Sequence, residues 1–285
     1  MTAYESPSAP SWRARAIRRL LGPARAERAL GEWGLVRERA RLAAHRRDDD
    51  FAKRNAAYLR SFADAFAGER CVIIGNGPSL NETNLSLLRH EATFGLNRIY
   101  LKFPEMGFRT TFHVVVNQLV VEQCGSELAA LDAPLFTTWP SREHLERRDA
   151  IAFLDSLPEP AHRPRFSRRA DVGVWEGATV TYVAMQLAYY MGFREVILVG
   201  VDHRFAVEGK PHTVVVSESA DASHFDPAYF GPGFRWQLPD LETSEYAFRL
   251  ARREFERAGR RVLDATVGGA LEVFPKVDLA EALGK

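Results

Sequence analysis

The sequence predicts an α/β protein built on a doubly wound, mostly parallel sheet. Short apolar runs rich in β-branched residues end in glycine turns, and segments of helical periodicity lie between them. The two kinds of segment alternate along the chain, which is typical of a parallel sheet covered by helices on both faces. A basic stretch of helical periodicity precedes this pattern, so we expect an N-terminal arm in front of the sheet domain.

The arm is expected to hold two helices. Residues 12–21 and 24–44 each mix apolar side chains with arginines, and Gly22-Pro23 separates the two segments. The first ten residues are small, polar and proline-bearing, and we expect them to be disordered. A further helix is predicted at 50–67, ending at Gly68.

The sheet is predicted to begin at 71–74, where Cys-Val-Ile-Ile precedes a glycine turn and a helix expected at 84–89. The clearest later pair is an apolar helix at 179–191, closed by Gly192, and a buried strand at 195–200. The remaining predicted elements are strands at 93–96, 113–117, 134–138 and 261–264, and a helix at 244–258 capped by Thr243 or Ser244.

The composition bounds the class of protein. With 285 residues, 46% of them hydrophobic and 26% charged, the chain fits one large or two small globular domains. It contains no run of about 18 apolar residues that could span a membrane, and no apolar signal core near its start. Cys71 and Cys124 alone form neither a disulfide framework nor a zinc cluster, which favours the reducing cytoplasm.

The net charge of +1 hides an uneven distribution. Residues 1–55 carry 13 Lys and Arg against 7 Asp and Glu, a net +6, which leaves 25 against 30, a net −5, for the rest. One interpretation of the basic arm is contact of residues 12–47 with an anionic surface, either the inner face of a membrane or a polyanionic glycan. The other, which is the commoner role of basic amphipathic helices, is a helical hairpin packed on the body or on a second subunit of a homo-oligomer. No recognised nucleic-acid-binding module accompanies the arginines, so nucleic acid is not an expected partner.

The glycine turn after the first predicted strand is a candidate phosphate-binding loop. Glycines there let backbone N–H groups approach a ligand, and the next helix directs its N-terminus at it. The turn lacks the Gly-Lys-Ser/Thr end of a Walker loop, and Leu80 stands where the G-x-G-x-x-G motif needs glycine. A tight turn rarely needs both Gly75 and Gly77, which favours nucleotide or phosphate binding. Ser79 has the alternative role of capping the following helix.

Three asparagines follow predicted strands. Asn76, Asn97 and Asn117 are each expected at the carboxyl end of a strand, where parallel α/β sheets form their ligand crevice. Their neutral amides offer donors and acceptors that suit a nucleobase or ribose edge. Each of them taken singly is also an ordinary turn residue.

Two further residues are candidates for chemistry. Asp202 ends the clearest strand, where it would bind a metal ion or a ribose hydroxyl, or cap a helix. His224 lies in a long loop at 223–236 of the kind that forms lids, and it is the best general-base candidate, with a structural loop histidine as the alternative. No zinc-ligand spacing and no G-x-S-x-G elbow occurs.

Several motifs together resemble one family. They are the segment at 71–80, Leu-Asn-Arg-Ile-Tyr at 96–100, the helix and strand at 179–202, His-Phe-Asp-Pro-Ala-Tyr-Phe-Gly at 224–231, and Asp-Ala-Thr-Val-Gly-Gly-Ala-Leu-Glu-Val-Phe-Pro at 264–275. Over residues 68–280 the chain resembles the 6-hydroxymethylpterin diphosphokinase MptE-like domain family. The same motif order is similar to bacterial CMP-sialic acid sialyltransferases and to the motility accessory factors that attach nonulosonic acids to flagellin.

The sialyltransferase resemblance implies that the three asparagines contact CMP and that His224 is the general base that deprotonates the acceptor hydroxyl. It implies no cofactor. The chain departs from that pattern at two positions: Val180, flanked by Thr179 and Thr181, stands in place of a serine beside the phosphate, and Arg204 stands in place of a tyrosine. Arg204 is expected to supply a positive charge to the phosphate instead.

The diphosphokinase resemblance implies transfer of diphosphate from ATP to a pterin alcohol. Such a reaction needs Mg²⁺, for which Asp202 is the first candidate ligand and Asp226 the second. A third hypothesis is a non-catalytic nucleotide-binding scaffold in glycan assembly, with Val180 and Arg204 as its support.

The interpretation we favour is a Rossmann-like domain at 68–280 behind a basic helical arm at 1–60. From the resemblance we expect a glycosyltransferase-like enzyme of polysaccharide or glycoprotein assembly, peripheral to the membrane. We expect it to use a CMP-activated sugar donor such as a nonulosonic acid and a glycan or glycoprotein acceptor. Its expected catalytic residue is His224, and the expected nucleotide-binding residues are Gly75, Asn76, Gly77, Ser79, Asn97, Asn117, Thr179, Thr181, Asp202 and Arg204.

Overall fold

The computed structural model describes residues 50–145, 149–157, 164–205 and 209–285. The chain divides into two compact units, Met1–Arg54 and Asn55–Lys285. Of the first unit the structure describes only the start of helix α3 (Asp50–Ser61), so the expected disordered start and the two arm helices lie outside the described residues. No helix of the described part is long and apolar enough to cross a membrane.

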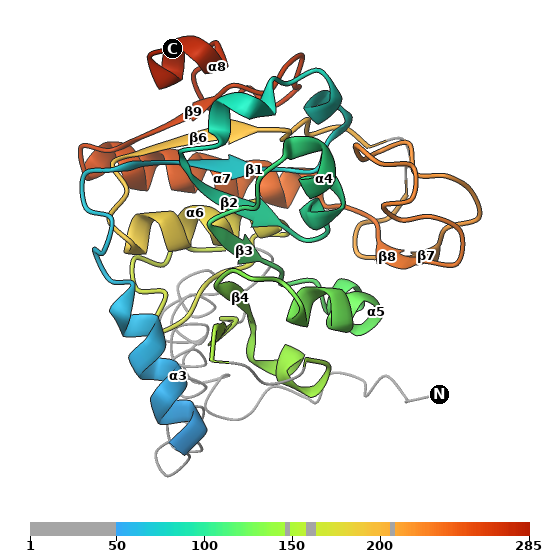
Figure 1. The fold of residues 1–285 in the computed structure, drawn as a ribbon, viewed down its shortest axis with the longest axis horizontal. Helices are drawn as coiled ribbons and strands as arrows, with labels where there is room; N and C mark the ends of the chain where they lie inside the picture. Colours follow the sequence, from blue (N-terminus) through green and yellow to red (C-terminus); the bar gives the residue numbers. More distant parts are fainter. Residues whose placement is uncertain (1–49, 146–148, 158–163, 206–208) are drawn as a thin grey trace, which may run out of the picture. The chain divides into compact units, whose positions relative to one another are not determined.

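The second unit contains a seven-stranded parallel sheet, with the order β5-β4-β3-β2-β1-β6-β9 (Figure 1). Every neighbouring pair of strands runs in parallel, so the predicted α/β fold with a doubly wound sheet is confirmed. The strands are β1 (Arg70–Ile74), β2 (Ala92–Leu96), β3 (Phe112–Val114), β4 (Leu135–Thr138), β5 (Ile151–Leu154), β6 (Glu195–Val199) and β9 (Arg261–Asp264).

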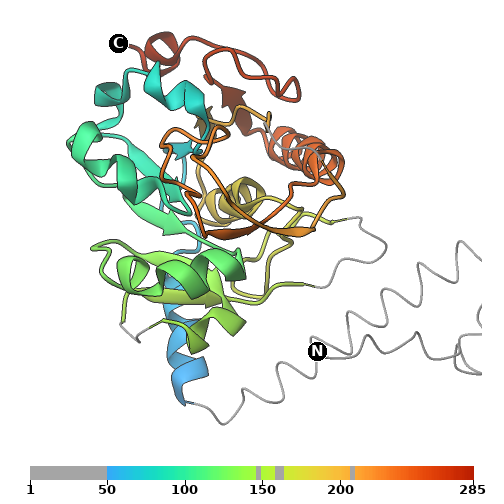
Figure 2. The same cartoon turned by 90° about the vertical axis from the view of Figure 1, so that its right-hand side faces the viewer.

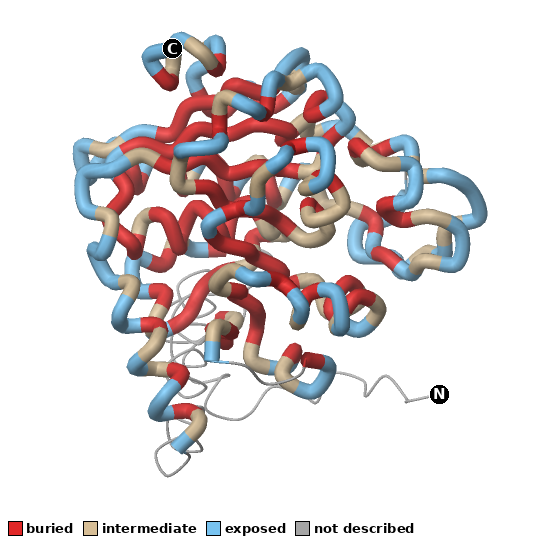
Figure 3. The backbone as a smooth tube through the Cα atoms, viewed as in Figure 1, coloured by how far each residue is buried: buried red, intermediate tan, exposed pale blue. Residues whose placement is uncertain are grey.

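Helices cover both faces of the sheet (Figure 2). Helix α6 (Val180–Tyr190) packs against α7 (Leu241–Arg257) on one face. The short helices η1 (Pro78–Asn81), η2 (Leu85–Leu88), η3 (Ile99–Lys102) and α4 (Phe103–Met106), and helix α5 (Gln118–Ala129), cover the other. The strands between these layers are almost entirely buried (Figure 3), which agrees with their predominantly apolar sequences. The remaining elements are η4 (Trp139–Glu143), the antiparallel hairpin of β7 (Val214–Val216) and β8 (Arg235–Gln237), and α8 (Leu279–Leu283).

Strand β1 is the point at which the strand order reverses, because it pairs with β2 on one side and with β6 on the other. The two loops that leave β1 and β6 stay joined beyond the strands: Gly75 N–H donates to Val199 O at 2.8 Å, and Gly77 N–H donates to Gly200 O at 2.9 Å. In open α/β sheets the ligand crevice lies at the carboxyl ends of the strands beside such a reversal. The topology therefore points to the loops after β1 and β6.

Two predicted helices differ from the structure. The helix at 50–67 ends at Ser61, because Asp64 has a φ of +51° and its N–H donates instead to Tyr190 O at 3.0 Å. After β1 the chain forms the short 3-10 helices η1 and η2 instead of an α-helix at 84–89. The expected helix N-terminus directed at a phosphate is therefore absent from this loop.

Three smaller predictions are corrected. Strand β3 ends at Val114, three residues before the predicted end. Helix α7 begins at Leu241, and its cap is neither Thr243 nor Ser244 but Asp240, whose carboxylate accepts from Thr243 N–H at 2.9 Å. The sequence did not predict β5, α4, α5, α8 or the hairpin of β7 and β8.

Candidate functional site

A cavity of about 930 Å³ opens at the carboxyl edge of the sheet. Its volume lies within the range of ligand pockets, about 300–1,000 Å³. Most of the sequence-predicted site residues line it: Gly75, Asn76, Gly77, Asn97, Asn117, Thr179, Thr181, Asp202, Arg204 and His224. Ser79 and Asp226 are not among the lining residues.

Backbone strain concentrates at this cavity. Five non-glycine residues of the described part have a positive φ, and four of them line it: Asn97, Ala178, His203 and His212, with φ of 46°, 57°, 55° and 63°. Such conformations cost on the order of 1–3 kcal/mol each for residues with a Cβ and are enriched at functional sites. The strained residues of the described chain therefore cluster at this cavity, as is common at functional sites.

The two glycines after β1 are explained by packing. A Cβ on Gly75 would overlap Gly200 O, and a Cβ on Gly77 would overlap the Asp202 carboxylate. The expectation that the turn does not need both glycines is therefore wrong. At each position the absence of a Cβ lets the loop that follows β6 pack closely. A phosphate ligand is not required to account for either residue.

The carboxylate of Asp202 is hydrogen-bonded to Ser79. Its Oδ1 accepts from Ser79 N–H at 3.1 Å, and its Oδ2 accepts from Ser79 Oγ at 2.6 Å. Asp226, the second candidate metal ligand, accepts from Ala228 N–H at 2.7 Å. Within the described ranges no three or more His, Cys, Asp or Glu side chains gather to hold a metal ion. Asp202 and Asp226 are therefore both engaged in hydrogen bonds with the chain itself.

The three asparagines differ in what their side chains bind. Asn117 caps α5, since its Oδ1 accepts from Leu119 N–H at 2.9 Å. Asn76 donates from Nδ2 to Leu96 O at 3.1 Å, but its Oδ1 is buried without a partner among the described residues. The Oδ1 of Asn97 is likewise buried without a partner among the described residues. A buried acceptor without a partner is rare, so Asn76 and Asn97 hold hydrogen-bonding capacity that a ligand can satisfy.

His224 is held by a carboxylate and an aromatic ring. Its Nδ1 lies 2.7 Å from Asp221 Oδ2, and its ring stacks on Tyr229 with centroids 4.0 Å apart at 11°. Burial opposes ionisation of Asp221, but hydrogen bonds from His224, Ser223 and Phe230 outweigh it and lower the pKa of the carboxyl group. With Nδ1 engaged, Nε2 is the ring nitrogen left for a partner outside the described residues.

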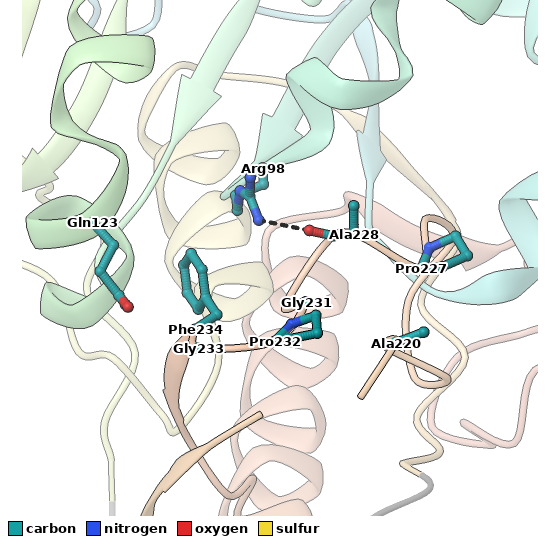
Figure 4. Close-up of a pocket in the computed structure, with 9 residues that line it drawn as sticks. All are labelled: Arg98, Gln123, Ala220, Pro227, Ala228, Gly231, Pro232, Gly233 and Phe234. Carbon is teal, nitrogen blue, oxygen red and sulfur yellow. Dashed lines mark hydrogen bonds between the residues drawn. The ribbon is translucent and has the colours of Figure 1, made fainter. Parts of the chain in front are cut away.

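The segment that carries His224 is anchored to the sheet. Phe225 N–H donates to Asn76 O at 2.9 Å, next to the glycine turn. The Arg98 guanidinium, just beyond β2, donates to Ala228 O at 3.1 Å and to Tyr229 O, and it lies over the Phe234 ring at 5.0 Å. Figure 4 shows this anchor at a second cavity, of about 620 Å³, on another side of the same segment. The base candidate therefore lies on a braced loop.

Helix α6 opens onto the cavity at its N-terminus. Thr179 caps the helix by accepting from Thr181 N–H at 3.3 Å, and Val180 lies at the cavity with them. The positive end of the helix dipole favours an anion there. Arg204 is exposed in the lining, with one hydrogen bond of 3.2 Å to Gly268 O, which leaves other guanidinium donors for a ligand. Sequence analysis named Thr179, Thr181 and Arg204 as nucleotide-binding residues, and it also expected a phosphate-directed helix after β1, where the structure has the 3-10 helix η1.

Asp221, Arg98 and Tyr229 were not identified from the sequence. Asp221 carried a signal, because it precedes His224 by three residues in a loop. Arg98 and Tyr229 lie within the motifs at 96–100 and 224–231, but nothing in those motifs indicates that the two residues meet, since they stand 131 positions apart.

The family model described as 6-hydroxymethylpterin diphosphokinase MptE-like matches residues 50–208. Among solved structures, the MAf glycosyltransferase from Magnetospirillum magneticum AMB-1 is similar, with a TM-score of 0.48 and 15% sequence identity. That similarity covers 79% of this chain but only 38% of the other. A search of curated proteins gives no match.

Proposed function

The chain belongs to the 6-hydroxymethylpterin diphosphokinase MptE-like family, and from this premise we propose that it is a nucleotide-dependent transferase of the glycosyltransferase kind. It would transfer a sugar from a CMP-activated donor to a hydroxyl group of a glycan or glycoprotein. The observation that carries this proposal is the pairing of His224 with Asp221 beside the cavity, at 2.7 Å.

The pair suits general-base catalysis at a hydroxyl. Asp221 accepts a hydrogen bond from the Nδ1–H group of His224. The proton then stays on Nδ1, and Nε2 keeps a lone pair that can accept a proton. Nε2 takes the acceptor proton as the acceptor oxygen bonds to the anomeric carbon. The bond from that carbon to the phosphate oxygen breaks, and the electron pair leaves with CMP. The acceptor proton therefore ends on His224, the sugar on the acceptor oxygen, and the electron pair of the broken bond on CMP.

The cavity offers matching contacts for the nucleotide. The unpartnered Oδ1 atoms of Asn76 and Asn97 would accept from ribose hydroxyls or the cytosine amino group. The N-terminus of α6 and the Arg204 guanidinium would bind the phosphate. Neutral and cationic groups of this kind stabilise a leaving phosphate without a bound metal ion.

A pterin diphosphokinase is the second candidate, favoured by the description of the matching family model. It would need Mg²⁺ held by phosphates and one or two carboxylates. Asp202, its main candidate ligand, already accepts two hydrogen bonds from Ser79. The donor groups at the cavity therefore fit the sugar transferase better.

Thermal shift separates the two candidates and the non-catalytic scaffold. The full chain is heated with CMP, CTP, ATP or GTP, each with and without Mg²⁺. Stabilisation by CMP without metal is expected; stabilisation by ATP only with Mg²⁺ would replace our proposal with the diphosphokinase. Release of CMP from CMP-sialic acid then tests catalysis. His224→Ala should lower it by about 10²–10⁴-fold and keep the CMP shift, while the exposed His90→Ala stays at the wild-type rate. CMP binding without any release in the wild type would indicate a scaffold.

A further inference from the structure

The hairpin of β7 and β8 carries the His224 segment between its two strands. A two-stranded ribbon is marginally stable alone, because the outer edges of its strands lack partners. In this structure one edge is not left open. The edge of β8 meets helix α5 at Arg235.

Gln123 takes the place of a neighbouring strand at that edge. Its Oε1 accepts from Arg235 N–H at 2.8 Å, and its Nε2 donates to Arg235 O at 2.8 Å. The same Nε2 donates to Leu119 O at 2.6 Å, which ties the side chain to its own helix. A primary amide can act as donor and acceptor toward one residue, as a strand does. Figure 4 shows Gln123 beside Phe234, the residue before Arg235.

Ring contacts connect this edge to the base candidate. Trp236, next to Arg235, stacks on Phe230 with centroids 5.6 Å apart. Phe230 meets His224 edge-on at 4.9 Å, and its N–H donates to Asp221 Oδ2 at 3.1 Å. A shift of β8 would therefore move Phe230, which touches both members of the pair.

Helix α5 also contacts the nucleotide side of the cavity. Its cap Asn117 and its first residues, Gln118 and Leu119, line the cavity. The helix kinks at Cys124, directly after Gln123, where φ is −126°. The helix that begins at the cavity therefore also holds β8, about one turn further along.

We propose that Gln123 is a positioning residue, whose side-chain amide fixes the β8 edge and through Phe230 holds His224 against Asp221. The inference rests on the proposed function only in taking His224 as the base. Because Gln123 touches neither His224 nor the nucleotide contacts named above, its loss should disorder the base and spare nucleotide binding.

The test compares Gln123→Ala, Gln123→Glu and Glu122→Ala in the full chain. Carbethoxylation of His224 by diethyl pyrocarbonate is followed by mass spectrometry, with the exposed His90 as internal reference. In the wild type His224 should react slowly, since its side chain is 12% exposed. Gln123→Ala should raise the His224 rate several-fold. Gln123→Glu still accepts from Arg235 N–H but cannot donate to Arg235 O. Its His224 modification rate should therefore lie between those of the wild type and Gln123→Ala.

Glu122→Ala is the matched control, because it removes only the 3.0 Å ion pair with Arg235. It should react as the wild type does. An unchanged His224 rate in folded Gln123→Ala would overturn the proposal, and Gln123→Glu decides by the same rate if the alanine variant does not fold. A lower kcat for CMP release with the donor KM and the CMP thermal shift retained supports positioning, whereas loss of CMP binding would indicate a general structural role. The modification rate needs no turnover, so it separates this inference from failure of the transferase proposal.

Discussion

Ser79 and Asp202 join the loops after β1 and β6 through two hydrogen bonds, from Ser79 N–H at 3.1 Å and from Ser79 Oγ at 2.6 Å. Both bonds end on the carboxylate, so they are charge-assisted. They lie at the strand where the sheet order reverses, beside the cavity. Asp202 therefore holds the two loops together beside the cavity, independently of any ligand that it also contacts.

Asp202→Asn should destabilise the fold by about 1.5–3 kcal/mol, the range for a lost hydrogen bond to a charged group. The amide keeps one acceptor oxygen for Ser79 N–H, but its NH₂ group cannot accept from Ser79 Oγ, and the charge that strengthens both bonds is lost. Urea unfolding measures the change. In a Ser79→Ala background the same substitution should cost less, because the shared contact is already weakened. Fully additive effects would show that the contact does not account for the loss.

Gly77→Ala should destabilise the chain by about 3 kcal/mol, more than a typical surface change. The new Cβ overlaps the Asp202 carboxylate, so that side chain must leave Ser79. Gly231→Ala is the matched control, because its Cβ would lie 3.6 Å from its nearest neighbour, Ala228. It should stay within about 0.5 kcal/mol of the wild type. Equal losses by urea unfolding at the two positions would contradict the steric account.

The sheet was predictable because its strands are buried on both faces. In β6 the four residues after Glu195 are all apolar, and that signal is local. The end of α3 was not predictable, since Asp64 leaves the helix to bond Tyr190, 126 positions later. The hairpin was missed for a related reason: β8 is only three residues long and its edge is completed by a glutamine from α5.

The site was predictable to the extent that strand ends identify it. Asn76, Asn97 and Asp202 follow β1, β2 and β6, and topology alone brings them to one edge. The groups proposed to orient His224 could not be predicted from the sequence, because Phe230 and Gln123 act through contacts that exist only in the folded loop. Their roles, like those of the nucleotide-binding candidates, stay predictions.

Asn76→Ala should weaken CMP binding about tenfold, equivalent to about 1.4 kcal/mol. The substitution removes the buried Oδ1 that has no partner in the described chain and that lies at the cavity. Isothermal titration with CMP on the folded variant measures the loss. The exposed Asn84→Ala controls for a general effect of losing an asparagine and should bind as the wild type does. Unchanged affinity in Asn76→Ala would remove this residue from the nucleotide site.

Asp221 should make stability depend on pH in one direction. Its pKa is lower in the fold than in the unfolded chain, because hydrogen bonds from His224, Ser223 and Phe230 outweigh its burial. The stabilisation is present above the ordinary carboxyl pKa of about 3.9 and is lost as the pH falls through the folded value. Asp221→Asn should therefore be less stable than the wild type at pH 7, and the gap should close below about pH 4.

Urea unfolding at several pH values between 7 and 3 follows that gap. Gly231→Ala introduces no titrating group, so its own gap to the wild type should stay constant over the same range. A gap for Asp221→Asn that is equally constant would show that the carboxylate gains nothing from its three donors.

The basic arm should bring the chain to an anionic membrane surface, which we propose as the role of residues 12–47. Each Lys or Arg near such a surface contributes about 1 kcal/mol. Replacing Arg13, Arg15, Arg18 and Arg19 by glutamine should therefore lower binding of the full chain to phosphatidylglycerol vesicles by at least about tenfold in flotation. Phosphatidylcholine vesicles should bind neither form, and high salt should release the wild type. Equal flotation of the two forms, with a change in oligomeric mass for the variant, would assign the arm to subunit contact instead.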